Sequence, residues 1–159
     1  MVRIRKIMVA CDFSEYSEEA LRYAIEVAAD LKSDLIVVNV INQKDVDVIR
    51  MVAIGGEGIS EEAFIKNRME NRSERINQLL EETPASHLSV KKILKVGTPF
   101  REIIQAIKDE GVDLVVMGPK GRSNLAGILF GSTAKKMFRH CPVPLLSVRT
   151  NRHESIWDR

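Results

Sequence analysis

The regular alternation of short apolar runs with longer segments of helical periodicity constrains the fold of this chain more than any other feature. Each run is rich in Val, Ile and Leu and has the length of a buried strand. The five runs are residues 6–11, 34–41, 88–96, 112–117 and 143–148. Strands separated by helices in this way predict an α/β fold, with a five-stranded parallel sheet covered by helices on both faces.

The segments between the runs carry the spacing and the end signals of helices. Leu21, Ala24, Ile25 and Ala28 follow the i, i+3, i+4, i+7 rule of an amphipathic helix. The predicted helix ends are Ser14 or Ser17 for the first helix, Ser60 to about residue 82 for a long charged helix, Thr98 to Gly111 for the next, and Gly131 onwards for the last. Residues 42–60 lack this periodicity and contain a cluster of glycines, so we expect a mobile loop there.

Length and composition bound the class of protein. The chain has 159 residues, enough for one domain with a real core, which we place at residues 1–150, before a polar tail at 151–159. Its 24 basic and 22 acidic residues leave a net charge of +2, which gives no reason to expect a nucleic-acid or membrane surface. Aromatic residues make up 5% of the chain, too few for the stacking platforms that bind single-stranded nucleic acid.

The sequence gives no sign of export or membrane anchoring. No apolar run approaches the roughly 18 residues of a membrane span, and the apolar stretch near the N-terminus is too short for a signal peptide. Cys11 and Cys141 lack the spacing of a metal site. We therefore expect a cytoplasmic protein with two reduced thiols.

The expected topology brings two distant segments together. In the strand order 3-2-1-4-5, the order reverses between the first and fourth strands, and parallel sheets bind ligands in the crevice at such a point. Asp12 follows the first strand, whereas Met117 and Gly118 follow the fourth. The Asp12 side chain should therefore lie beside the loop that begins at Gly118.

That loop contains glycines and hydroxyls in an arrangement that suits an anion. Gly118 and Gly121 bracket the exit from the strand, and Gly131, Ser132 and Thr133 open the last helix. Backbone N–H groups can converge on a phosphate where no side chain obstructs them, and a helix N-terminus adds free donors. A tight turn followed by an ordinary Ser132 cap fits the same spacing, so the residues alone leave both interpretations open. The Walker A and dinucleotide glycine patterns both fit worse.

The spacing Gly118-x2-Gly121-x9-Gly131-Ser132 resembles the signature of the universal stress protein family, in its nucleotide-binding branch. The resemblance covers nearly the whole chain, from "KIMVACDFSEYSEEAL" at the first strand to "VDLVVMGPKGRSNLAGILFGSTAKKMFRHCPVPLLSV" at the end. It implies a Rossmann-like fold of the adenine nucleotide alpha hydrolase type. It also implies a regulatory, ATP-binding protein of the stress response.

The resemblance implies roles for individual residues. The positions that match family contacts are Asp12 near the ribose and adenine, Val40 on adenine, Met117 at the floor of the site, and Gly118, Gly121, Gly131, Ser132 and Thr133 at the phosphates and ribose. Arg122 either neutralises phosphate or lies in solvent. The implied ligand is ATP, AMP or ADP. Because three phosphates concentrate negative charge, Mg²⁺ should accompany ATP, held by phosphates, water and Ser132 or Asn124.

Three residues leave details of the site open. Asp12 and Glu15 have the spacing of a capping box, so Asp12 can instead serve as a helix cap. Pro119 removes one N–H from the loop, and Lys120 either reaches a phosphate or lies in solvent.

No arrangement of residues in the sequence points to catalysis. His87, His140 and His153 form no evident catalytic set, and no carboxylate adjoins Ser132 in sequence. The expected function is regulatory ATP binding, with a downstream partner that the sequence does not name. The alternatives are a slow ATPase, self-phosphorylation at Ser132 or Thr133, and an interaction module with a vestigial nucleotide site.

The last strand, residues 143–148, predicts a homodimer. It should lie at an edge of the sheet, and it is apolar and uncharged, which makes it a poor edge to expose to water. Pairing with a twofold-related copy would cover it, and related proteins often dimerise through this strand. The alternative is a monomer in which the tail, with Ile156 and Trp157, covers the edge.

Overall fold

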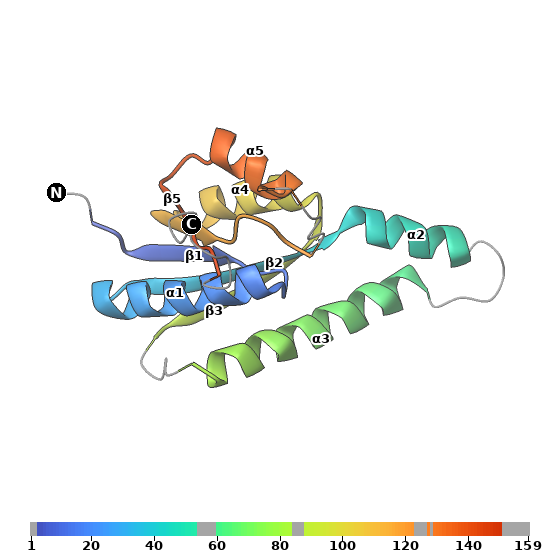
Figure 1. Cartoon of the computed structure of the whole chain (residues 1–159). Helices are drawn as coiled ribbons and strands as arrows, with labels where there is room; N and C mark the ends of the chain where they lie inside the picture. Colours follow the sequence, from blue (N-terminus) through green and yellow to red (C-terminus); the bar gives the residue numbers. More distant parts are fainter. Residues whose placement is uncertain (1–2, 54–59, 84–87, 123–126, 128, 151–159) are drawn as a thin grey trace.

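The chain folds around a five-stranded parallel sheet whose strand order is β3-β2-β1-β4-β5, as predicted (Figure 1). The computed structural model describes residues 3–53, 60–83, 88–122, 127 and 129–150. The strands are β1 Lys6–Ala10, β2 Asp34–Asn42, β3 Val90–Gly97, β4 Leu114–Met117 and β5 Leu145–Ser147. In the parallel register, Val9 pairs with both Val37 and Val116, so the carboxyl ends of β1, β2 and β4 meet at one end of the sheet.

Helices cover both faces of this sheet. They are α1 Glu15–Leu31, α2 Gln43–Ala53, α3 Glu61–Glu81, α4 Pro99–Glu110 and α5 Ser132–His140. Figure 1 shows α1 and α3 on one face and α4 and α5 on the other. Ser14 caps α1, because its side chain accepts a hydrogen bond from the Ser17 amide, and this settles the choice between the two serines.

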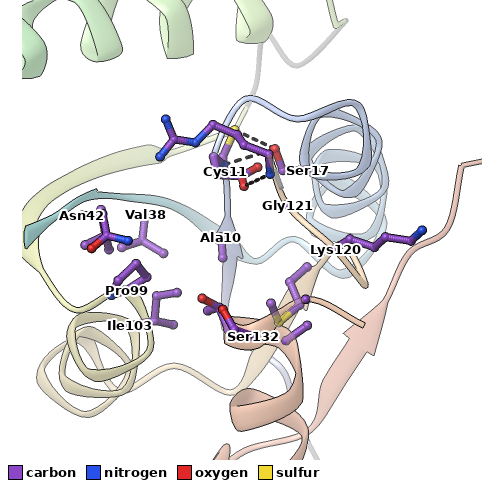
Figure 2. A pocket seen from close by; sticks show the side chains of 18 of the residues that line it. Ala10, Cys11, Ser17, Val38, Asn42, Pro99, Ile103, Lys120, Gly121 and Ser132 are labelled. Atoms are coloured by element: carbon purple, nitrogen blue, oxygen red, sulfur yellow. Dashed lines mark hydrogen bonds between the residues drawn. The ribbon is translucent and has the colours of Figure 1, made fainter. Parts of the chain in front are cut away.

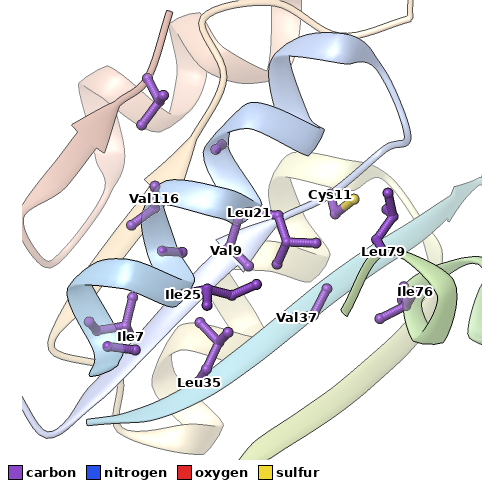
Figure 3. Close-up of a cluster of buried hydrophobic side chains, with 14 residues drawn as sticks. Ile7, Val9, Cys11, Leu21, Ile25, Leu35, Val37, Ile76, Leu79 and Val116 are labelled. Carbon is purple, nitrogen blue, oxygen red and sulfur yellow. The ribbon is translucent and has the colours of Figure 1, made fainter. Parts of the chain in front are cut away.

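Two hydrophobic clusters hold these layers together, one on each side of the sheet. In the first, Ile7 and Val9 of β1 pack with Leu21 and Ile25 of α1 (Figure 3). The second lies on the other side, where Met8 packs with residues of α4 and α5. Ile7, Met8 and Val9 thus point alternately to opposite faces, and all three are fully buried, as expected for a central parallel strand.

The prediction of a mobile loop at residues 42–60 is wrong for residues 43–53, which form α2. Val46 is fully buried, which fixes one side of this helix. Its C-terminal end is joined to α3, because the Arg50 guanidinium donates hydrogen bonds to the Glu61 carboxylate at 2.7 and 2.9 Å. The glycines that suggested a loop follow the helix, and residues 54–59 lie outside the described part of the chain.

Within the described ranges, no helix combines the length and the apolar character needed to cross a lipid bilayer. The predicted tail at 151–159 lies outside the described residues, as does its Trp157.

Candidate functional site

A cavity of about 380 Å³ opens at the carboxyl ends of β1 and β4, where the strand order reverses (Figure 2). All the residues singled out by the glycine spacing and the family resemblance line it: Asp12, Val40, Met117, Gly118, Gly121, Arg122, Gly131, Ser132 and Thr133. Apolar side chains form one wall. Figure 2 shows Val38, Pro99 and Ile103 gathered on one side of the cavity, with Lys120 and Gly121 on the other.

Asp12 joins the end of β1 to the glycine loop. Its Oδ1 accepts hydrogen bonds from the Ser14 amide at 3.0 Å and the Ser14 hydroxyl at 2.6 Å. Its Oδ2 accepts one from the Arg122 amide at 3.0 Å, which confirms that topology brings the two segments together. The helix-cap alternative for Asp12 is wrong, because Ser14 is the N-cap of α1. A carboxylate has about four acceptor positions, so this arrangement leaves Asp12 capacity for one further donor.

Two of the loop glycines are required by close approach. A Cβ at Gly118 would lie 2.6 Å from Tyr16 Cβ and 3.0 Å from the Tyr16 carbonyl carbon, so the loop packs directly on the first turn of α1. A Cβ at Gly121 would overlap Asp12 Oδ2. These two glycines therefore let the loop reach Asp12, which is a structural reason for the first half of the spacing.

The second half of the spacing forms the N-terminus of α5. The N-cap is Gly131, where the sequence allowed Ser132, and no side chain forms a capping hydrogen bond. The Ser132 and Thr133 amides thus lack intrahelical acceptors at the positive end of the helix. The Gly131 amide donates to the Pro119 carbonyl at 2.9 Å, so Pro119 fastens the loop to this helix although it offers no donor of its own.

Charged side chains surround the mouth of the cavity. Arg122 Nη2 lies 3.7 Å from Asp45 Oδ2 of α2, and both side chains are about half exposed. Lys120 Nζ lies 5.7 Å from the centre of the Tyr16 ring, and Figure 2 shows this side chain leading away from the cavity. The sequence did not point to Asp45 as a lining residue, because the segment that carries it was expected to be a loop.

A buried hydrogen-bond network holds part of the backbone that lines the cavity. Arg72 of α3 donates to Asn39 Oδ1 at 2.6 Å and to the Val40 carbonyl at 3.1 Å. Asn39 Nδ2 in turn donates to the Cys11 carbonyl at 2.7 Å. Burial, followed by the nearby Arg122 guanidinium, lowers the pKa of Arg72. The network holds the backbone of two lining residues, Cys11 and Val40, and sequence patterns gave no sign of it.

The described residues offer no cage for a metal ion. Within them, no group of three His, Cys, Asp or Glu side chains is placed to hold one. The Asp12 carboxylate is largely occupied by backbone and hydroxyl donors. Asn124, a candidate from the sequence, lies outside the described part of the chain. A divalent ion in this cavity would thus need ligands from a bound molecule and water.

Comparison with known proteins shows which family this chain resembles in sequence and in fold. A model of the universal stress protein family matches residues 3–149. Universal stress protein MJ0577 of Methanocaldococcus jannaschii is 31% identical, with the match covering 93% of this chain and 96% of that protein. The solved structure of MJ0577 has a TM-score of 0.76 at 28% identity and covers 94% of this chain and 99% of its own.

More distant solved structures share the fold. A universal stress protein in complex with cAMP has a TM-score of 0.62 at 21% identity, covering 94% of this chain and all of that one. The universal stress protein of Archaeoglobus fulgidus in complex with dAMP has a TM-score of 0.60 at 20% identity, with the same coverage. With the family model spanning nearly the whole sequence, this chain belongs to the universal stress protein family.

Proposed function

We propose that the cavity binds an adenine nucleotide, with ATP as the principal ligand, and that the chain is a regulatory nucleotide-binding protein of the stress response. The observation that carries the proposal is the union, in one cavity, of an apolar wall, an anchored carboxylate and an uncapped helix N-terminus. Each feature suits a different part of a nucleotide: base, ribose and phosphates.

The parts of the ligand follow from the chemistry of the lining. Adenine packs between Val40 and the side chains of Pro99 and Ile103. The ribose hydroxyls donate to the remaining acceptor position of Asp12. The phosphates lie at the Ser132 and Thr133 amides, where the α5 dipole favours negative charge.

Relatives support the class of ligand. Two universal stress proteins with the same fold are in complex with cAMP and dAMP, and both of these ligands carry adenine. Regulation and the choice of ATP over other adenine nucleotides rest on the resemblance to the family, and a cytoplasmic location rests on the composition of the sequence.

Mg²⁺ would accompany ATP. Since the described residues provide no carboxylate cage, the ion would be held by phosphate oxygens and water, with the Ser132 hydroxyl as the protein ligand. Calorimetry with and without EDTA tests this, because ATP affinity should fall when the chelator is present. Equal affinity in both conditions would count against the ion.

Titration calorimetry of ATP into the wild type and into Gly131→Val tests the site. Gly131 has φ −69° and ψ 164°, which valine adopts readily, so the backbone tolerates the change. A Cβ added there would lie 3.4 Å from Lys120 Cα and 3.6 Å from the Gly121 amide nitrogen, so a branched side chain would fill the space beside the loop. We expect Gly131→Val to abolish ATP binding and Gly131→Ala to weaken it less. ATP binding by Gly131→Val at the wild-type affinity would remove the phosphate assignment.

A further inference from the structure

A second cavity lies outside the nucleotide site, between the first turn of α4 and the exposed side of α5. It is an open groove of about 750 Å³, lined by residues 100, 101, 130, 135, 136 and 138–140, and we name it the basic-aromatic groove. Its lining is separate from that of the first cavity. Nothing in the proposed nucleotide site uses these side chains.

The charged side chains that line the groove are basic. Arg101 of α4 and Lys135, Lys136 and Arg139 of α5 line it, and all four side chains are exposed. Among the residues that the structure describes, none of the four forms an ion pair with an acid. The acid next in sequence, Glu102, turns its carboxyl group to Gly97 at the end of β3. The whole chain carries a net charge of only +2, so this is a local concentration of positive charge.

Aromatic rings lie among these cations. The Phe130 and Phe138 rings meet edge to face with centroids 5.1 Å apart, and Phe100 contacts the His140 ring at 5.8 Å. Phe138 is 47% exposed, and Leu129, next to Phe130 in sequence, is 71% exposed. An exposed aromatic side chain with charges around it is typical of an interaction site.

We propose that the basic-aromatic groove binds an acidic segment of a protein partner, with carboxylates on the four cations and an apolar side chain on Phe138. The groove lacks acidic lining residues in the described part of the chain, so its charge is complementary to such a segment along its whole length. An aromatic anchor surrounded by charges is the usual composition of a peptide-binding hot spot.

The geometry favours a peptide over the other polyanions. Single-stranded nucleic acid stacks its bases on open ring faces, whereas here Phe130 and Phe138 are engaged with each other and Phe100 with His140. An anionic membrane is bound by an extended amphipathic face, and this site is a groove between two helices.

Fluorescence anisotropy with a labelled acidic peptide, composed of Asp and Glu around one Trp and one Leu, tests the proposal. The wild-type chain should bind the peptide saturably, and added salt should weaken the binding. The double variant Lys135→Glu/Arg139→Glu should lose at least about tenfold in affinity, and Phe138→Ala should lose about fivefold. The matched control is Lys66→Glu/Lys108→Glu, which makes the same change in net charge at exposed positions of α3 and α4 and should change affinity by less than about twofold.

Circular dichroism and urea unfolding of each variant show whether it is folded, independently of any nucleotide binding. Absence of saturable peptide binding to the folded wild type would overturn the proposal. Equal losses in the double variant and in its control would also overturn it, because net charge alone would then explain the binding. Tighter binding of an oligothymidylate than of the peptide would overturn the proposal in favour of a nucleic acid. Tighter binding of phosphatidylserine vesicles would overturn it in favour of a membrane.

Discussion

At the scale of single residues, Asp12 links the architecture of the site to its ligand. Three of its acceptor positions hold the start of α1 and the glycine loop, and one is left, which we assign to the ribose of the proposed nucleotide. We expect Asp12→Ala to weaken ATP binding by about 1–3 kcal/mol in titration calorimetry, because the proposed hydrogen bond to the ribose and the anchor of the loop are both lost.

Asp45→Ala is the matched control for this change. It removes another carboxylate from the cavity lining, but one whose half-exposed side chain lies 3.7 Å from Arg122. ATP affinity should stay the same or rise slightly, because a negative charge is removed from the lining of a cavity that is proposed to hold an anion. If both variants lose the same affinity, the specific role of Asp12 is wrong.

Arg72 acts behind the site, through the network that it forms with Asn39 and Val40. Arg72→Met keeps much of the apolar stem but leaves the Asn39 oxygen buried without its donor. The free energy of unfolding, measured with urea, should fall by about 1–3 kcal/mol. Arg68→Met, one turn earlier in α3, removes a guanidinium whose contact among the described residues is with the Phe64 ring, at 5.2 Å from its centre, and should cost less than about 1 kcal/mol. Equal costs would contradict the importance of the buried network.

At the scale of helices and strands, periodicity was sufficient for most of the fold. The strands could be predicted because each apolar run is rich in Val, Ile and Leu and has the length of a strand. The end signals at Ser60 and Gly111 lie where α3 begins and α4 ends. The helix α2 could not be predicted, because it is held in place by one buried residue, Val46, and by an ion pair between Arg50 and Glu61 of α3. Both depend on tertiary contacts that have no local pattern.

Part of the candidate site could likewise be predicted from the sequence, and part could not. The glycine spacing pointed to the loop and the start of α5, because close approach and free amides demand particular residues at fixed positions. The network of Arg72 with Asn39, and the pairing of Asp45 with Arg122, join segments far apart in sequence. Single polar residues on helices give no signal of such partners.

Two helix caps in this fold differ in one hydrogen bond. The Ser60 side chain accepts from the Ala63 amide at 3.2 Å, whereas Thr98 forms no side-chain capping bond. Both residues are exposed. In urea unfolding, Ser60→Ala should cost about 1 kcal/mol and Thr98→Ala clearly less. A larger cost for Thr98→Ala would show that its hydroxyl caps α4 in solution.

At the scale of the whole molecule, the outer edge of β5 is the feature with the largest consequence. This strand pairs only with β4 among the described strands, and Leu146 is 38% exposed. The Ser147 hydroxyl is buried and has no hydrogen-bond partner in the described part of the chain. An edge of this kind is stabilised by pairing with another strand, so a homodimer through β5 remains our prediction.

Light scattering at micromolar concentration measures this directly. The mass should be about twice the 17.9 kDa of the chain, and Leu146→Asp should reduce it to the monomer value while ATP still binds. A wild-type mass near that of one chain would end the dimer prediction. A dimer that persists in Leu146→Asp would place the interface elsewhere.

The central claim is that an adenine nucleotide occupies the crevice between β1 and β4, with its phosphates at the start of α5. Backbone amide chemical shifts, followed by NMR during an ATP titration, report the location residue by residue. We expect the largest saturable shifts at Gly121, Ser132 and Thr133, and no comparable shifts in the middle of α1 or at Lys135 and Arg139 in the groove. Shifts that cluster away from these three amides, or none at saturating ATP, would contradict the claim.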